Sequence, residues 1–188
     1  MLSTNDLEIA EVGLACDVEV PFLREGELAQ DNTLMLPVVQ SVLDRLDPDG
    51  DTVEAVVLLQ PTSPLRLSGD IDGAIDLFLD RNPDSVVSVV PVPHIYHPLK
   101  VLRPTETGLL PFLDDRPAVS GHRDLPPAFA RNGPAVLITQ ASVIRQGSLY
   151  GDVSLPYEMP AERSVDIDDP LDLAFAEYLI EQARSNKN

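Results

Sequence analysis

TVEAVVLL at residues 52–59 runs directly into QPTSPLR at residues 60–66, and these two segments are the best guide to the architecture. The first is an apolar run of strand length, which is typical of a strand buried on both faces of a parallel sheet. The pattern then predicts a helix at about 70–81 and a second apolar strand at 85–92. Strand, helix and strand in this order indicate an α/β sheet with right-handed crossovers.

Upstream of this motif the apolar spacing predicts two helices. The first covers residues 6–15 and places four apolar residues on one side, namely Leu7, Ile9, Ala10 and Leu14. The second lies within residues 27–46, where Pro37 either kinks the helix or marks its beginning.

Downstream, the sequence predicts strands at 135–139 and 154–159, with a short helix at 141–145 between them. A final helix begins after Asp169, which is a good N-cap, with Pro170 at its first position. This helix is expected to bury one stripe of side chains, made of Leu171, Ala174, Phe175, Tyr178 and Leu179.

Residues 93–131 interrupt the alternation of strands and helices. The segment is rich in proline and has no clean helical period, which predicts an extended arm or a small hairpin. We expect this arm to be an insertion in a single domain that covers residues 1–188, a length that allows a substantial core.

The composition excludes several classes of function. The chain has 13 Lys and Arg against 31 Asp and Glu, a net charge of −18, and a polyanion repels nucleic acids and anionic membranes. No apolar run is long enough to span a bilayer and no signal peptide is visible, so a cytoplasmic location is expected. Cys16 is the only cysteine, and His94 and His97 lack partners for a zinc set, so these histidines are expected to pack in a loop.

Two segments offer groups suited to chemistry. QPTSPLR carries an amide, two hydroxyls and a guanidinium at the carboxyl end of a strand, where open α/β sheets bind ligands. A proline-rich turn with a helix cap is the alternative. In SVDIDDP at 164–170, Asp166 and Asp168 would point to the same side of an extended segment and form a Mg²⁺ site. The alternative is that Asp168 and Asp169 only cap the final helix, although capping and metal binding can coexist.

A third segment, RDLPPAFARNG at 123–133, carries two guanidiniums and an amide that suit a carboxylate or a phosphate. A solvated loop with an Asn-Gly turn is the alternative.

Taken together, these segments resemble the acylneuraminate cytidylyltransferases, also called CMP-sialic acid synthetases. LQPTSPLR at 59–66, followed by DIDxPxDL at 166–173, is the specific part of the match. The resemblance covers essentially the whole chain, and its other matching pieces are Ser3-Thr4-Asn5-Asp6, Pro21-Phe22-Leu23-Arg24, Leu28-Ala29-Gln30-Asp31, Asp70-Ile71, Ser88-Val89, His97-Pro98, Lys100, Arg123-Asp124-Leu125-Pro126 and Asn132-Gly133.

The resemblance implies a three-layer α/β nucleotidyltransferase fold with a mostly parallel sheet. It implies a reaction in which a nonulosonic acid, a sugar of the sialic type, reacts with CTP to give the CMP-sugar and pyrophosphate. It also implies Mg²⁺ on Asp166 and Asp168, and a homodimer in which the arm at 93–131 reaches into the partner subunit.

The resemblance also assigns roles to residues. Asp166, Asp168 and Gln60 are the expected catalytic residues, and Ser3 and Arg24 lie on the nucleotide side. The acid sugar is expected to meet the remaining residues of the set, which are Thr62, Ser63, Lys100, His122, Arg123, Arg131 and Asn132.

The sequence departs from the family at its beginning. It starts at the family's Ser-Thr-Asp element, without the preceding first strand and the Gly-, Arg- and Lys-containing loop that wraps a triphosphate. An alternative expectation is therefore an N-terminally truncated, catalytically incompetent paralogue that acts as a sugar-binding or assembly module. Changes at 121–126 and 132–136 leave open neuraminic, legionaminic and pseudaminic acids, and a guanine nucleotide in place of CTP.

Overall fold

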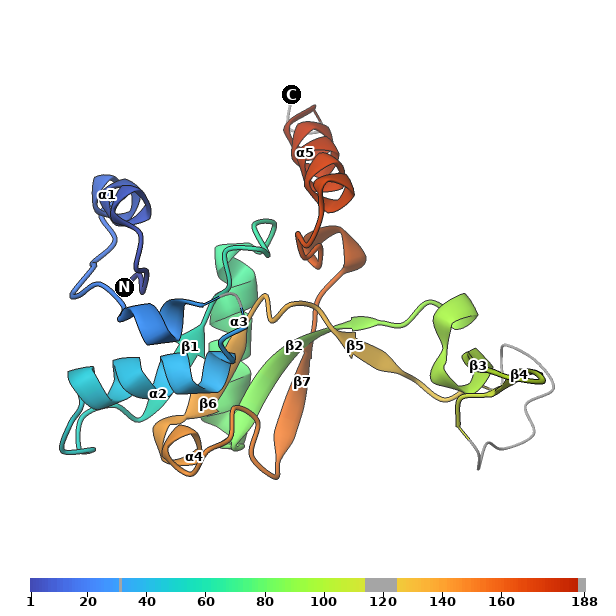
Figure 1. Ribbon diagram of the computed structural model, residues 1–188, viewed down its shortest axis with the longest axis horizontal. Coiled ribbons are helices and arrows are strands. Elements are labelled where there is room, and N and C mark those ends of the chain that lie inside the picture. The colour runs from blue at the N-terminus through green and yellow to red at the C-terminus, as the bar shows by residue number, and fades with distance from the viewer. Residues whose placement is uncertain (31, 114–124, 186–188) are drawn as a thin grey trace. The chain divides into compact units, whose positions relative to one another are not determined.

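The computed structural model describes residues 1–30, 32–113 and 125–185 (Figure 1). The chain divides into two compact units. The first unit contains Met1–Val56 and Thr139–Gly151, and the second contains Val57–Ile138 and the chain from Asp152 onward. The boundary passes through β1 (Ala55–Leu58) and β6 (Leu137–Gln140), so each of these strands begins in one unit and ends in the other. The assignment of the whole chain to one domain stays a prediction.

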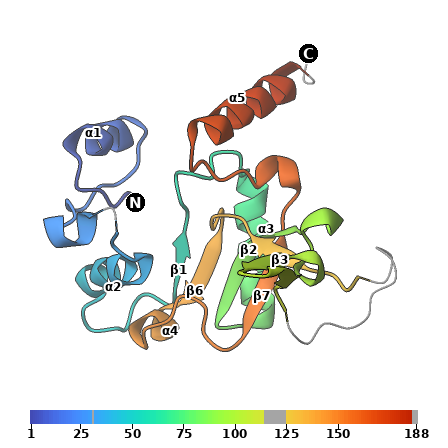
Figure 2. The same ribbon diagram turned by 45° about the vertical axis from the view of Figure 1, so that its right-hand side comes forward.

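The main sheet has the strand order β1-β6-β2-β5, and β7 also pairs with β2. Figure 2 shows β6 between β1 and β2. The remaining strands of this sheet are β2 (Ser85–Pro91), β5 (Phe129–Arg131) and β7 (Ser154–Glu158). β2 runs parallel to β7, with Ser85 opposite Ser154, and antiparallel to β5, with Pro91 opposite Phe129. Helix α3 (Ser68–Arg81) packs against β2 and buries Ala74 and Phe78. The predicted strand-helix-strand motif and α/β class are confirmed.

Strand β1 is shorter and more exposed than its sequence predicts. The strand was expected over 52–59 with both faces buried, yet it covers only Ala55–Leu58, and Val57 is 39% exposed. It begins late because the Asp47 carboxylate binds the backbone amides of Thr52 and Val53. It is exposed because it is the terminal strand in the order of the sheet, so the prediction of two buried faces is wrong.

The first unit contains mainly helices, which are α1 (Leu7–Ala15), a 3₁₀ turn (Gly26–Ala29), α2 (Met35–Leu46) and α4 (Ala141–Arg145). Pro37 is the third residue of α2 and marks its beginning, because an amide in the first turn has no acceptor within the helix. Helix α2 packs against α4, and Gln40 Nε2 donates a hydrogen bond of 2.8 Å to the Ile144 carbonyl.

A buried ion pair fixes the turn after α2. The Asp47 side chain is 2% exposed, receives a hydrogen bond of 2.6 Å from Arg145 Nη2, and accepts the amide of Asp51 in addition to those of Thr52 and Val53. Burial alone would raise the pKa of Asp47, but the hydrogen bonds from Thr52, Val53 and Arg145 hold it well below its usual range. The charged carboxylate therefore contributes to the stability of the first unit.

Replacing Asp47 by Asn is expected to lower the midpoint of thermal unfolding by a few degrees at pH 7. A carboxyl with a depressed pKa contributes stability above its unfolded pKa, near 3.9, and loses it as pH falls through the folded pKa. The difference in stability between wild type and variant should therefore shrink between pH 5 and the lowest pH at which the protein stays folded. Urea unfolding across this range measures it, and a difference that grows on acidification would contradict this role of Asp47.

The segment at 93–131 contains two 3₁₀ turns (His94–Tyr96 and Pro98–Lys100) and the hairpin of β3 (Leu102–Thr105) and β4 (Gly108–Pro111). The hairpin forms a separate two-stranded sheet, which confirms the predicted small hairpin. Its role as a dimerisation arm stays a prediction.

The final helix, α5 (Pro170–Ser185), follows a 3₁₀ turn at Ala161–Arg163 and begins as predicted. The Asp169 carboxylate accepts the amides of Leu171 and Asp172, so it does cap the helix. The predicted stripe is wrong: Leu171, Phe175 and Tyr178 are at least half exposed, and Ala176 is the residue that is buried. A helical period shows which apolar residues share a face, but not whether another element covers that face.

The predicted face of α1 is likewise largely exposed, with only Ala10 and Gly13 of the helix buried. None of the helices in the described part of the chain is long and apolar enough to cross a bilayer.

Candidate nucleotide and sugar site

The loop at residues 60–66 follows β1, and the side chain of Arg66 fixes its shape. Nη1 donates hydrogen bonds to the carbonyls of Gln60 (2.7 Å), Ser63 (2.9 Å) and Ala135 (3.2 Å). Burial of this guanidinium among neutral carbonyls lowers the pKa of Arg66. Two of the bonds close the loop on itself and the third ties it to the chain beyond Gly133. Arg66 is not among the predicted site residues, although its place at the end of the QPTSPLR motif was a usable signal.

Asn132 connects strand β2 of the main sheet to the segment before α5. Its Oδ1 accepts a hydrogen bond of 2.6 Å from Ser88 Oγ in β2, and its Nδ2 donates one of 2.9 Å to Ser164 Oγ. The amide also contacts the Met159 sulfur at 3.6 Å, and Asn132 is only 4% exposed. These contacts give Asn132 a linking role within the protein. Its predicted contact with the sugar stays a prediction.

The acidic segment before α5 lies against the loop at 60–66. The Ile167 amide donates a hydrogen bond of 2.8 Å to the Thr62 carbonyl. Asp166 is half-buried and Asp168 is exposed, so the two predicted ligands differ in their surroundings. The structure therefore brings Thr62 and the Asp166 segment together from parts of the sequence about a hundred residues apart.

Gly133 is the point where these segments come closest. Its φ is +116°, a conformation that side chains disfavour, and a Cβ built on it would lie 2.6 Å from Ser63 Oγ and 3.4 Å from Asp166 Oδ1. The hydroxyl and the carboxylate oxygen therefore face the same small space. Only glycine leaves that space open.

Four buried side-chain atoms have no hydrogen-bond partner in the described part of the chain, and all four belong to predicted site residues. They are Ser63 Oγ and Asp166 Oδ1 in the second unit, and Ser3 Oγ and Arg24 Nε in the first. Folded proteins rarely leave buried polar atoms unpaired, and each one requires an explanation such as a ligand. The sequence-based choice of these residues thus coincides with the places where the fold leaves polar groups available.

Ser3 and Arg24 are adjacent in the first unit. Thr4 pairs with Leu23 as an isolated parallel bridge, and the Arg24 amide donates to the Thr4 carbonyl at 2.8 Å. The Arg24 guanidinium also donates to the carbonyls of Ser3 (3.3 Å) and Leu28 (3.4 Å). These two bonds use both terminal nitrogens of the Arg24 guanidinium. Its Nε, like the Ser3 hydroxyl, has no partner among the described residues.

The remaining predicted residues are spread over other positions. Gln60 is half-buried and its carbonyl binds Arg66, whereas Lys100 and Arg131 are exposed, at the end of a 3₁₀ turn and of β5. His122 and Arg123 lie outside the described residues. Among those described, no group of three or more His, Cys, Asp or Glu side chains could hold a metal ion.

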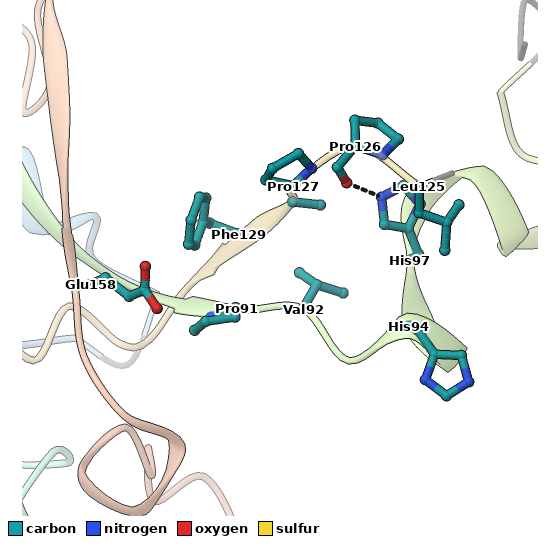
Figure 3. A pocket seen from close by; sticks show the side chains of 10 residues that line it. Pro91, Val92, His94, His97, Leu125, Pro126, Pro127, Phe129 and Glu158 are labelled. Atoms are coloured by element: carbon teal, nitrogen blue, oxygen red, sulfur yellow. Dashed lines mark hydrogen bonds between the residues drawn. The ribbon is translucent and has the colours of Figure 1, made fainter. Parts of the chain in front are cut away.

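A cavity of about 300 Å³ lies where the segment at 93–131 joins the main sheet (Figure 3). Its lining is mostly apolar and includes Val92, Pro127 and Phe129, with Glu158 at one side. His97 packs here as expected for a loop histidine: Nε2 lies 3.0 Å from the Pro126 carbonyl, and Nδ1 accepts the Leu99 amide. This arrangement places the proton on Nε2 and makes His97 a structural residue of the segment.

Comparison with known proteins gives consistent relatives, although no protein-family model matches the chain. The chain is 28% identical to a CMP-N,N'-diacetyllegionaminic acid synthase of Legionella pneumophila, over 96% of this chain and 77% of the relative. It is 24% identical to a pseudaminic acid cytidylyltransferase of Campylobacter jejuni, over 95% of this chain and 76% of the relative.

An N-acylneuraminate cytidylyltransferase A of Danio rerio is 30% identical over 95% of this chain, which spans 40% of that protein. Among solved structures, a CMP-2-keto-3-deoxy-manno-octonic acid synthetase in complex with CTP matches 96% of this chain and 80% of that chain, with a TM-score of 0.66 and 12% identity. This match supports the nucleotidyltransferase fold. The sequence relatives and the matched motifs agree in pointing to the acylneuraminate cytidylyltransferases as the family that this chain resembles.

Proposed function

We propose that the protein transfers the cytidylyl group of CTP to a nonulosonic acid and releases pyrophosphate. The observation that carries this proposal is the coincidence of the four unpartnered buried atoms with residues predicted to bind the nucleotide, the sugar and the metal ion. The names of the relatives in Legionella pneumophila and Campylobacter jejuni support the same substrate class.

In the proposed reaction the anomeric hydroxyl of the acid sugar attacks the α-phosphorus of CTP in line. The new phosphorus–oxygen bond forms as the bond to the β-phosphate oxygen breaks, the hydroxyl proton leaves to solvent, and no covalent enzyme intermediate arises. The protein must therefore align two anions and stabilise charge on the phosphoryl oxygens. We assign alignment of the sugar to the loop of Gln60, Thr62 and Ser63, whose Oγ is available to donate a hydrogen bond.

Asp166 and Asp168 are the residues we propose to hold Mg²⁺. The buried, unpartnered Oδ1 of Asp166 and the open space at Gly133 fit a cation, and Mg²⁺ needs only one or two carboxylates beside water and phosphate oxygens. When bound, the ion would neutralise phosphate charge. Ser3 and Arg24 would contact the nucleotide, and Lys100, Arg131, His122 and Arg123 would attract the sugar carboxylate.

We further propose that the protein is a homodimer formed through residues 93–131, and that it works in the cytoplasm, where CTP is made. The support for the dimer is a set of large apolar side chains in this segment, each 39% or more exposed: Ile95, Tyr96, Val101, Leu102, Leu109, Leu110, Phe112, Leu113 and Phe129. Such a concentration of exposed apolar surface is typical of a protein–protein interface.

Replacing both Leu109 and Phe112 by Ser is expected to raise the dimer dissociation constant by at least about tenfold, because each side chain would lose buried apolar area. Sedimentation equilibrium measures this change. Leu34→Ser is the matched control, since Leu34 is 76% exposed but lies outside the segment. The proposed interface would be refuted if the wild type were a monomer at micromolar concentration. It would also be refuted if Leu34→Ser raised the dissociation constant as much as the double change at Leu109 and Phe112.

The test of the activity is pyrophosphate release by the purified protein with Mg²⁺, each of the four ribonucleoside triphosphates, and neuraminic, legionaminic and pseudaminic acids. We expect release that requires CTP and one of the three sugars. Saturable sugar binding without pyrophosphate release would favour the binding module over the enzyme.

A further inference from the structure

A partly buried ion pair joins two parts of the candidate site that are 93 residues apart in the sequence. Arg163 Nε donates to Asp70 Oδ2 at 2.9 Å, and Arg163 Nη2 donates to Asp70 Oδ1 at 2.8 Å. The Asp70 side chain is 3% exposed and that of Arg163 is 36% exposed. This two-point geometry fixes the orientation of the arginine as well as its distance.

Each partner lies beside a predicted site segment. Asp70 is in the first turn of α3, and its Oδ2 also accepts the Leu67 amide at 2.8 Å, directly after the loop at 60–66. Arg163 ends the 3₁₀ turn at Ala161–Arg163 and stands three residues before Asp166. The pair thus fixes one end of the acidic segment to the end of the loop, and the bond from Ile167 to Thr62 fixes its other end.

An ion pair with a buried carboxylate is an inefficient way to add stability, because the cost of removing the Asp70 charge from water offsets much of the attraction to Arg163. Its value lies in holding one geometry. Burial opposes the charge on Asp70, yet the hydrogen bonds from Arg163 and Leu67 keep the pKa of Asp70 below its usual range. The hydrogen bond to Asp70 also raises the pKa of Arg163, so both partners stay charged at neutral pH.

We propose that Arg163 and Asp70 are positioning residues that hold Asp166 at the open space beside Gly133 and Ser63. The link to catalysis rests on the proposed function. The positioning itself does not rest on the proposed function, because it concerns the backbone of residues 163–167 in the protein without substrates. Without the pair, the segment keeps the bond from the Ile167 amide to Thr62 and the bond from Asn132 Nδ2 to Ser164 Oγ, but its chain is no longer held at Arg163, and the Asp166 carboxylate is less firmly fixed in direction.

Arg163→Gln and Arg163→Lys test the proposal, and Arg145→Gln is the matched control. Arg145 also pairs with a buried aspartate that binds backbone amides, its side chain is 29% exposed, and its hydrogen bonds among the described residues go to Asp47. Three measurements separate positioning from stability: hydrogen exchange of peptides covering 160–168, the dissociation constant of Mn²⁺ without substrates, and kcat against KM for CTP.

Arg163→Gln is expected to speed exchange in 160–168, weaken Mn²⁺ binding about tenfold and lower kcat about a hundredfold, the scale for a misplaced catalytic group. Arg163→Lys should recover part of each loss, and Arg145→Gln should change only thermal stability and exchange near Asp47. If Arg163→Gln changes stability alone, as the control does, the proposal is wrong. If wild type releases no pyrophosphate, the proposed function fails, and hydrogen exchange still decides whether the pair orders the segment.

Discussion

Asp166→Asn is expected to lower kcat by about a hundredfold or more, the scale for loss of a group that stabilises transition-state charge. The change keeps the size of the side chain but removes the negative charge. Because Oδ1 of Asp166 is buried without a partner, the charge is not required by any hydrogen bond within the described protein. Thermal stability should therefore be unchanged or slightly higher, which separates loss of function from loss of folding.

Asp169→Asn is the matched control for this result. Asp169 is three residues further on and carries the same charge, but its carboxylate caps α5 through the amides of Leu171 and Asp172. Asn caps helices about as well as Asp, so activity and stability should both stay close to wild type. Steady-state kinetics of the two variants measure this difference. If Asp166→Asn is as active as Asp169→Asn, Asp166 has no role in the proposed mechanism.

Gly133→Ala is the second change with a large expected effect. The new methyl group would lie 2.6 Å from Ser63 Oγ and 3.2 Å from the Ala135 amide nitrogen, and the φ of +116° would add backbone strain. The loop and the turn must move apart, so we expect about a hundredfold loss of kcat, the scale for a displacement near 1 Å, together with lower stability.

Gly147→Ala isolates the backbone component of this effect. Gly147 also has positive φ, at +92°, but a Cβ there would meet nothing within 4 Å. Its variant should lose about 1–2 kcal/mol of stability, the usual cost of a left-handed residue, and retain activity. Calorimetry and kinetics on the two variants measure both quantities. If Gly133→Ala retains full activity while folded, the space at Gly133 is not where the substrates or the ion bind.

Sequence patterns located the regular elements of this protein well because those elements depend on local chemistry. The short helix at 141–145, the strand before the QPTSP loop and the cap at Asp169 follow from apolar runs and capping residues that a single segment contains. The exposed faces of α1 and α5 could not be predicted, because the cover of an apolar face depends on other elements.

The residues of the candidate site were chosen from sequence motifs, and the contacts that connect them could not be. The motif comparison selected Ser63 and Asp166, and the fold leaves polar atoms of both unpaired. Nothing local in the sequence indicates that Arg66 binds the Ala135 carbonyl or that Arg163 pairs with Asp70. These contacts join residues 69 and 93 positions apart, and only the folded chain creates them.

Phosphorus NMR of the purified protein incubated with CTP, Mg²⁺ and the three acid sugars in turn tests the proposed cytidylyl transfer most directly. With the correct sugar, we expect the three signals of CTP to be replaced by one phosphodiester signal and one pyrophosphate signal in equal molar amounts. The Asp166→Asn variant should leave CTP intact on the same time scale. Unchanged CTP with wild type and every sugar, or release of inorganic phosphate in place of pyrophosphate, would contradict the proposal.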